Sequence, residues 1–148
     1  MDPAPDADTR KHVGTHPIIL ERLAANTCFA HFWTETFKKV MQLHAWTSVG
    51  ECLHISCYCR AGEKRSVAVC AVIQALLRRC GWQVDGVEHL AVWDWRRRRN
   101  CCGECADCRS TSLQHPTYNK VHDIWNCLAQ DWLQKAAAVG HREEDNYQ

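Results

Sequence analysis

The chain has 148 residues, a length that fits one domain able to bury roughly 68–70% of the surface exposed by its unfolded form. Its 18 basic and 17 acidic residues give a net charge of +1, so overall charge favours no class of partner, and any preference for anions must be local. No stretch approaches the ~20 apolar residues of a membrane-spanning helix, so we expect no membrane partner.

The first part of the chain is expected to be a flexible lead, residues 1–15, followed by two helices. A proline at a plausible first helical position predicts a short helix over Pro17–Ala25. From Cys28 to about Ala45, large apolar residues recur at steps of three and four, which predicts a longer helix with one face turned to a core.

The centre of the chain reads as a strand, a loop and a helix. Cys52–Tyr58, "CLHISCY", is a short apolar run typical of a buried strand. A clean helical period begins at Ser66 and ends before Gly81. Residues 82–90 are expected to return to the sheet as a second strand, parallel to the first because such crossovers are right-handed. The sequence therefore predicts an α/β fold over residues 16–90, with a small parallel sheet flanked by helices.

The last third of the chain changes composition. Residues 91–117 are rich in Trp, Arg and Cys and have little apolar periodicity. Tyr118–Val139 has the spacing of an amphipathic helix. Residues 91–148 are therefore expected to form a Cys-rich extension, held by a metal, and a C-terminal helix.

The loop between strand and helix, "CRAGEKRS", predicts an anion site. Such a turn aims consecutive backbone N–H groups at one point, where the helix dipole adds about half a positive charge. Gly62 permits an unusual backbone conformation, Arg65 offers a planar fork for two phosphate oxygens, and Ser66 can cap the helix. An ordinary tight turn with solvated basic residues is the alternative. The predicted phosphate-binding residues are Cys59, Arg60, Ala61, Gly62, Glu63, Lys64, Arg65 and Ser66.

The pattern Cys-x-x-Gly-x-x-Arg-Ser in this loop resembles the signature loop of protein tyrosine and dual-specificity phosphatases. The resemblance implies that Cys59 is a nucleophile and that Arg65 holds the equatorial phosphate oxygens. Tyr58, however, stands where that family has its histidine, and no Trp-Pro-Asp-like segment lies upstream to supply a general acid. Asp85 and Asp94 are the candidate acids for this alternative function, a cysteine-dependent phosphatase.

A second resemblance covers Arg10 to about Leu90. The order of a helical lead, an apolar strand, a Cys-x-Gly-Gly-x-His-Arg-Ser-Val-like loop, a long helix ending "LLRRCG" and a strand is similar to the C-terminal domain of RapZ-type RNase adapter proteins. The resemblance implies binding of a phosphorylated amino sugar, glucosamine-6-phosphate, in a sensor or regulatory role rather than hydrolysis. Lys64 replaces a histidine of that family, Arg60 a threonine and Ala61 a glycine, so the ligand is free to differ.

The segment "NCCGECADC" predicts a zinc site, because Cys-x-x-Cys spacing lets two thiolates from one turn share a metal. Adjacent cysteines cannot easily both bind one ion, so the fourth ligand is expected from His89, His115 or His122. Cysteine-dominated sites normally close the coordination shell, so the zinc is expected to be structural. An iron–sulfur cluster or a reduced thiol loop are the alternatives. The candidate cysteine ligands are Cys101, Cys102, Cys105 and Cys108.

The other cysteines and the basic run give two further expectations. The chain has eleven cysteines, an odd number, and its acidic start lacks the apolar core of a signal peptide, so we expect reduced thiols in the cytoplasm or another reducing intracellular compartment. The run "WDWRRRRN" favours nucleic-acid binding if its guanidinium groups contact phosphates, and a solvated basic face otherwise. The arginines concerned are Arg96, Arg97, Arg98 and Arg99.

Overall fold

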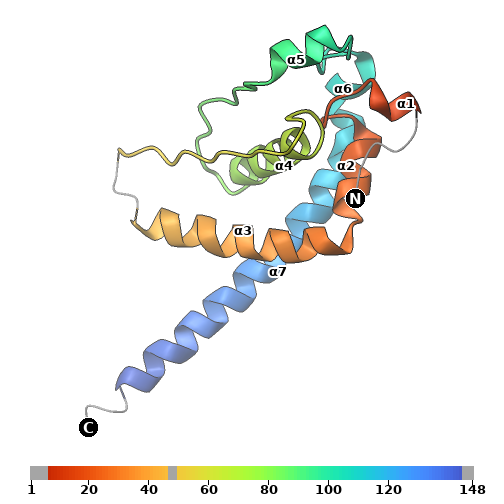
Figure 1. Cartoon of the computed structure of the whole chain (residues 1–148). Helices are drawn as coiled ribbons and strands as arrows, with labels where there is room; N and C mark the ends of the chain where they lie inside the picture. The colour runs from red at the N-terminus through yellow and green to blue at the C-terminus, as the bar shows by residue number, and fades with distance from the viewer. Residues whose placement is uncertain (1–6, 47–49, 145–148) are drawn as a thin grey trace.

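The structure, a computed structural model, describes residues 7–46 and 50–144. Within these ranges the regular elements are helices (Figure 1). They are α1 (Ala7–Arg10), α2 (Pro17–Ala24), α3 (Thr27–Trp46), α4 (Arg65–Arg79), α5 (Val92–Arg97), α6 (Ala106–Arg109) and α7 (Thr111–Glu144). None of the described helices combines the length and the apolar character that a membrane span requires.

The main core lies where α2, α3, α4 and α7 meet. The long helix α7 contacts the other three, and its far end projects beyond them (Figure 1). Trp125 of α7 lies 4.5 Å from Phe37, edge to face, and 5.7 Å from Trp33, measured between ring centroids. Both α3 rings are fully buried, as is Leu76 of α4. The apolar stripes that predicted α3, α4 and α7 therefore contribute the buried side chains of this core.

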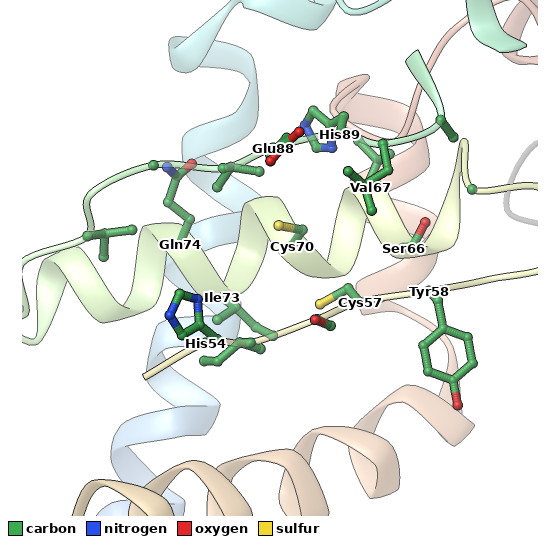
Figure 2. A pocket seen from close by; sticks show the side chains of 18 of the residues that line it. His54, Cys57, Tyr58, Ser66, Val67, Cys70, Ile73, Gln74, Glu88 and His89 are labelled. Atoms are coloured by element: carbon green, nitrogen blue, oxygen red, sulfur yellow. The ribbon is translucent and has the colours of Figure 1, made fainter. Parts of the chain in front are cut away.

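The predicted parallel sheet is wrong for the part of the chain that the structure describes. Residues 51–59 and 82–89 are extended, but neither makes a strand ladder. The two segments run along α4 and line one cavity with it (Figure 2). A local apolar pattern can set an extended backbone, but a sheet also needs a hydrogen-bonded neighbour. In the described chain, the neighbour of both extended segments is helix α4.

The segment before α2 packs against the start of α4. Thr9 and Val13 are buried, and the Gly14 amide donates to the Glu63 carbonyl oxygen at 3.0 Å. A Cβ atom on Gly14 would overlap the Lys64 carbonyl oxygen, so only glycine allows this approach. Residues 1–6 of the expected flexible lead lie outside the described residues. Residues 9–15 of that lead pack closely against the rest of the structure.

A second, smaller core joins this segment to the Cys-rich extension. Val13, Val67, Trp95 and Cys108 are its buried members, with the remaining cysteines of the extension packed around them. Val67 belongs to the first turn of α4, directly after the predicted anion loop. The extension and residues 9–15 therefore hold the loop from one side.

Candidate metal centre and the neighbouring loop

Four side chains form a group close enough to hold a metal ion. They are His12, Cys101, Cys105 and Cys108, whose ligand atoms all lie within 4.8 Å of one another. The Cys101 and Cys108 sulfurs are 3.6 Å apart. The His12 Nδ1 atom lies 3.3 Å from the Cys105 sulfur and 3.7 Å from the Cys108 sulfur.

These separations fit a tetrahedral zinc ion. Zinc binds thiolate sulfur at about 2.3 Å and imidazole nitrogen at about 2.0–2.1 Å, so tetrahedral angles place the ligand atoms roughly 3.5–3.8 Å apart. Three of the six separations between the ligand atoms fall close to that range, and all six are within 4.8 Å. Three sulfurs and one nitrogen also form a common structural zinc set. The donor set and these separations are therefore consistent with zinc.

The local backbone explains how the cysteines converge. Cys102 and Gly103 have positive φ angles, +54° and +79°, which turn the chain sharply after Cys101. Cys105 is the N-cap of α6, and its sulfur accepts a hydrogen bond from the Cys108 amide at 3.5 Å. This turn followed by a short helix brings three thiols of one segment to the same side.

His12 reaches the site from the opposite end of the sequence. The Cys101 amide donates to the Lys11 carbonyl oxygen at 2.9 Å, which fastens the two segments next to the ligands. The His12 ring packs on the His16 ring at 4.3 Å, and His16 Nε2 lies 3.9 Å from an Asp107 carboxylate oxygen. Such contacts behind a ligand fix its orientation.

Burial and the neighbouring Cys105 and Cys101 thiols raise the pKa of Cys108. Burial also raises the pKa of Cys101, but the backbone of Gly103 and Val13, with other donors, outweighs it and lowers that pKa to about 7. Close thiols resist joint ionisation, and a bound dication removes that resistance because it favours the thiolate form. The protein thus offers a site whose charge a metal would balance.

The structure brings together three of the four predicted cysteines and none of the three predicted histidines. The Cys102 thiol donates to the Asn100 carbonyl oxygen at 3.4 Å instead. His89 packs on Trp95 at 5.2 Å, His115 is exposed on α7, and His122 lies 3.3 Å from the Asn126 amide nitrogen. His12 is 93 residues from Cys105, so no spacing in the sequence could have identified it.

The predicted anion loop surrounds the Cys59 thiol. Its sulfur lies 3.2 Å from the Ser66 hydroxyl oxygen, at the start of α4. Burial raises the pKa of Cys59, but the Ser66 hydroxyl and the backbone amides of Ser66, Glu63 and Gly62 outweigh it and lower the pKa to about 7. The loop therefore stabilises negative charge at this sulfur. Ser66 does this from within the helix, since the N-cap of α4 is Lys64 and makes no side-chain cap.

Two charged residues of the loop, Glu63 and Lys64, fix the loop to neighbouring segments and line neither of the cavities described below. The Lys64 ammonium donates to the carbonyl oxygens of Arg10 at 2.8 Å and Thr9 at 3.3 Å, and also to that of His12. The buried Glu63 carboxylate pairs with Lys64 at 2.9 Å and with Arg98 at 3.1 Å. The loop is thereby tied to the segment that supplies the histidine ligand.

The extension also holds this loop directly. The Trp95 indole N–H donates to the Gly62 carbonyl oxygen at 3.0 Å. Asn100, which directly precedes the first candidate cysteine ligand, donates from its side-chain amide to the Glu63 carboxylate. Gly62 itself has φ = +60°, as the turn requires. Both segments of the metal centre therefore contact the loop directly.

Two cavities open beside Cys59. One, of about 1240 Å³, is lined by Cys59, Arg60, Arg65 and Ser66 together with side chains of α2 and α3 such as Phe29. The other, of about 560 Å³, lies between α4 and the two extended segments (Figure 2). The four loop residues that line the larger cavity thus include both arginines predicted to bind phosphate. Ala61 is exposed and lines neither cavity.

The two candidate acids of the phosphatase alternative lie elsewhere. Asp85 accepts a hydrogen bond from Gln83 at 3.2 Å, and Asp94 pairs with Arg97 at 2.7 Å. Neither lines a cavity beside Cys59. Glu88, which lines the smaller cavity, is the carboxylate that the described structure places there (Figure 2). Its position had no signal in the sequence pattern.

The basic run makes contacts within the extension and with the anion loop. Arg96 lies over the Trp93 ring at 5.3 Å, Arg97 pairs with Asp94, and Arg98 pairs with Glu63. Nucleic-acid binding through these arginines stays a prediction.

Comparisons of the chain with protein-family models, with curated proteins and with solved structures found no match.

Proposed function

We propose that this chain binds a small phosphorylated metabolite at residues 59–66 and that a structural zinc ion at His12, Cys101, Cys105 and Cys108 supports the binding loop. A phosphosugar is the first candidate, because the loop and α4 resemble the ligand loop of RapZ-type C-terminal domains. The role proposed with it is that of a sensor or regulator.

The observation that carries this proposal is the set of donors around the half-buried Cys59 sulfur. The Ser66 hydroxyl lies 3.2 Å from it and, with the backbone amides of Ser66, Glu63 and Gly62, lowers the pKa of Cys59 to about 7. Burial alone would push that pKa up, so the donors around the sulfur must offer strong stabilisation of negative charge. Backbone amides at a helix start are also the donors that phosphate oxygens use. The same point of the loop is therefore suited to a phosphate oxygen.

The cavity beside the loop supplies the second element of a phosphate site. Arg60 and Arg65 line it together with Ser66. A guanidinium group offers a phosphate two parallel hydrogen bonds, which adds geometric specificity to charge. About 1240 Å³ leaves room for the rest of a metabolite next to the phosphate. The proposed division is that the amides and arginines hold the phosphate and the cavity holds its organic part.

Zinc is proposed to act on structure alone. Its four protein ligands would fill a tetrahedral shell and leave no position for substrate. The chemistry it supplies when bound is to offset two of the three thiolate charges in this small core. Glu63, Lys64 and Asn100 connect that core to the loop, so the metal centre and the anion site form one unit.

Calorimetry with hexose 6-phosphates and inorganic phosphate tests the binding site. Arg65→Ala removes a charge-assisted fork of roughly 1.5–3 kcal/mol, so affinity should fall by about one to two orders of magnitude. Arg78→Ala is the matched control, because Arg78 is exposed in the last turn of the same helix. Equal affinities of the wild type and Arg65→Ala would overturn the proposal.

A cysteine-dependent phosphatase is the second candidate, favoured by the lowered pKa of Cys59 and its contact with the Ser66 hydroxyl. The thiolate would attack phosphorus and displace the ester oxygen, which leaves as an alcohol once it takes a proton. Turnover of an aryl phosphate that is lost in Cys59→Ser, with a trapped phosphocysteine, would establish this activity. Binding without turnover favours the sensor.

A further inference from the structure

The extended segment 51–59 presents one of its two sides to helix α4. Leu53, Ile55, Cys57 and Cys59 are half-buried, and the residues between them are exposed. Side chains two residues apart in an extended chain point to the same face. Cys57 therefore shares with Cys59 the face that contacts α4.

The position of Cys59 determines which residue of α4 lies opposite Cys57. Cys59 lies against Ser66, and two residues of extended chain advance by about 6.6 Å. Four residues of α-helix advance by about 6 Å and return to the same helix face, which leads from Ser66 to Cys70. This register brings the Cys57 and Cys70 side chains to the same side of their elements, and both line one cavity (Figure 2). Two thiols from separate elements thus lie beside one cavity, away from the metal centre.

The pair is open to small molecules. Both side chains line the cavity of about 560 Å³ between α4 and the extended segments, and Figure 2 shows both sulfurs within it. The neighbouring Cys57 thiol lowers the pKa of Cys70 to about 7, whereas Cys70 and burial raise the pKa of Cys57. Near neutral pH the pair therefore holds one thiolate and one thiol, the combination that thiol oxidation needs.

We propose that Cys57 and Cys70 are a redox site, at which hydrogen peroxide converts the thiol pair into a disulfide that fastens segment 51–59 to α4. The Cys70 thiolate attacks one peroxide oxygen, the O–O bond breaks, and Cys70 becomes a sulfenic acid with release of hydroxide. The Cys57 sulfur then attacks the Cys70 sulfur, and the sulfenic oxygen leaves as water with the Cys57 proton. Two thiols are oxidised and one peroxide is reduced.

The disulfide would add a covalent restraint to segment 51–59. Residues 51–59 make no strand ladder within the described chain and are held to α4 through side chains. Cys57 is two residues before Cys59, so a covalent link at Cys57 fixes the entry to the anion loop. Two residues of one extended chain, such as Cys57 and Cys59, are too far apart to bond easily. The alignment of segment 51–59 with α4 therefore makes Cys70 the expected disulfide partner of Cys57.

Site-resolved mapping of disulfides tests the proposal. Reduced, zinc-loaded full-length protein is treated with equimolar hydrogen peroxide, free thiols are alkylated, and peptides are identified by mass spectrometry without reduction. The linked Cys57–Cys70 peptide should form at least about tenfold faster than any other pair, because the two side chains already line the same cavity, and dithiothreitol should reverse it.

Variants separate this pair from general thiol oxidation. In Cys57→Ser, the Cys70 sulfenic acid should accumulate and react with dimedone, because it lacks its resolving thiol. Cys52→Ser is the matched control, since Cys52 is exposed on the same segment. It should leave the rate unchanged. Another pair forming first, or equal rates of disulfide formation in Cys52→Ser and Cys57→Ser, would overturn the proposal.

Discussion

His12 lies among the cysteine sulfurs with Nδ1 3.3 Å from one and 3.7 Å from another. Its ring is held by His16 on one side, and its backbone carbonyl accepts from Lys64. A side chain placed by both its ring and its backbone needs little reorganisation to bind a metal. At the scale of single residues, it therefore completes a site that the cysteine segment begins.

Removing this imidazole tests the ligand set. His12→Ala leaves three thiols, so we expect zinc affinity to fall by at least about 100-fold, since changes even behind a ligand cost 10–100-fold. His115→Ala is the control, because His115 is exposed on α7 and was a candidate ligand from sequence alone. Competition against a chromophoric chelator measures the zinc affinity of both variants. An unchanged affinity in His12→Ala would exclude His12 as a ligand.

At the scale of elements, the anion loop depends on two segments that are distant in sequence. Lys64 and Gly62 are each held by hydrogen bonds, to residues 9–12 and to Trp95 respectively. Glu63 is buried between Lys64 and Arg98. Because these contacts come from residues outside the loop, the conformation of the loop should be sensitive to substitutions in those residues.

Glu63→Gln should destabilise the protein by about 1.5–3 kcal/mol, since it leaves the mostly buried Lys64 ammonium without its anionic partner. Urea unfolding of the zinc-loaded protein measures the change. Glu35→Gln is the matched control: Glu35 also pairs with a lysine at 2.9 Å, but both side chains are more than half exposed, so its stability should hardly change. Equal stabilities of the two variants would show that Glu63 anchors nothing.

The sequence predicted local features of these elements and missed their long-range partners. The period of three and four in Thr27–Trp46 and Arg65–Arg79 identified both helices, because the signal lies within each segment. Cys52–Tyr58 is extended, but it is not the buried strand that its apolar run predicted: its residues alternate between exposed and half-buried, because pairing into a sheet depends on another segment. His12 was missed for the same reason, since its partners lie at the other end of the chain.

At the scale of the molecule, two cores share helix α4. The larger joins α2, α3, α4 and α7 around rings such as Trp33 and Trp125, and the smaller surrounds the cysteines. Val67 belongs to the smaller core and the adjacent Ala68 to the larger. The larger core is apolar and needs no metal, whereas the smaller one has few buried apolar side chains. Their stabilities should therefore differ in response to zinc.

Chelation of zinc should loosen residues 9–15 and 91–110 while α3 and α4 stay folded. Metal binding is folding free energy for the segments that carry the ligands, and the apolar core of the helices is independent of it. Hydrogen exchange before and after chelation, read by mass spectrometry, resolves the two regions. Full exchange in α3 would contradict this division, and substoichiometric zinc in freshly reduced protein would contradict the site itself.

The measurement that tests the central claim most directly is the pKa of Cys59 with and without phosphate. It is obtained from the pH dependence of Cys59 alkylation, resolved from the other cysteines by mass spectrometry, at matched ionic strength. We predict a pKa of about 7 without phosphate.

Phosphate bound by the same amides would repel the thiolate and favour the thiol. The account therefore predicts that saturating phosphate raises the pKa of Cys59 and, by linkage, that phosphate binds more tightly once Cys59 is protonated, below pH 7. A Cys59 pKa that is the same with saturating phosphate as without it would contradict the account, because the anion would then not lie at this loop.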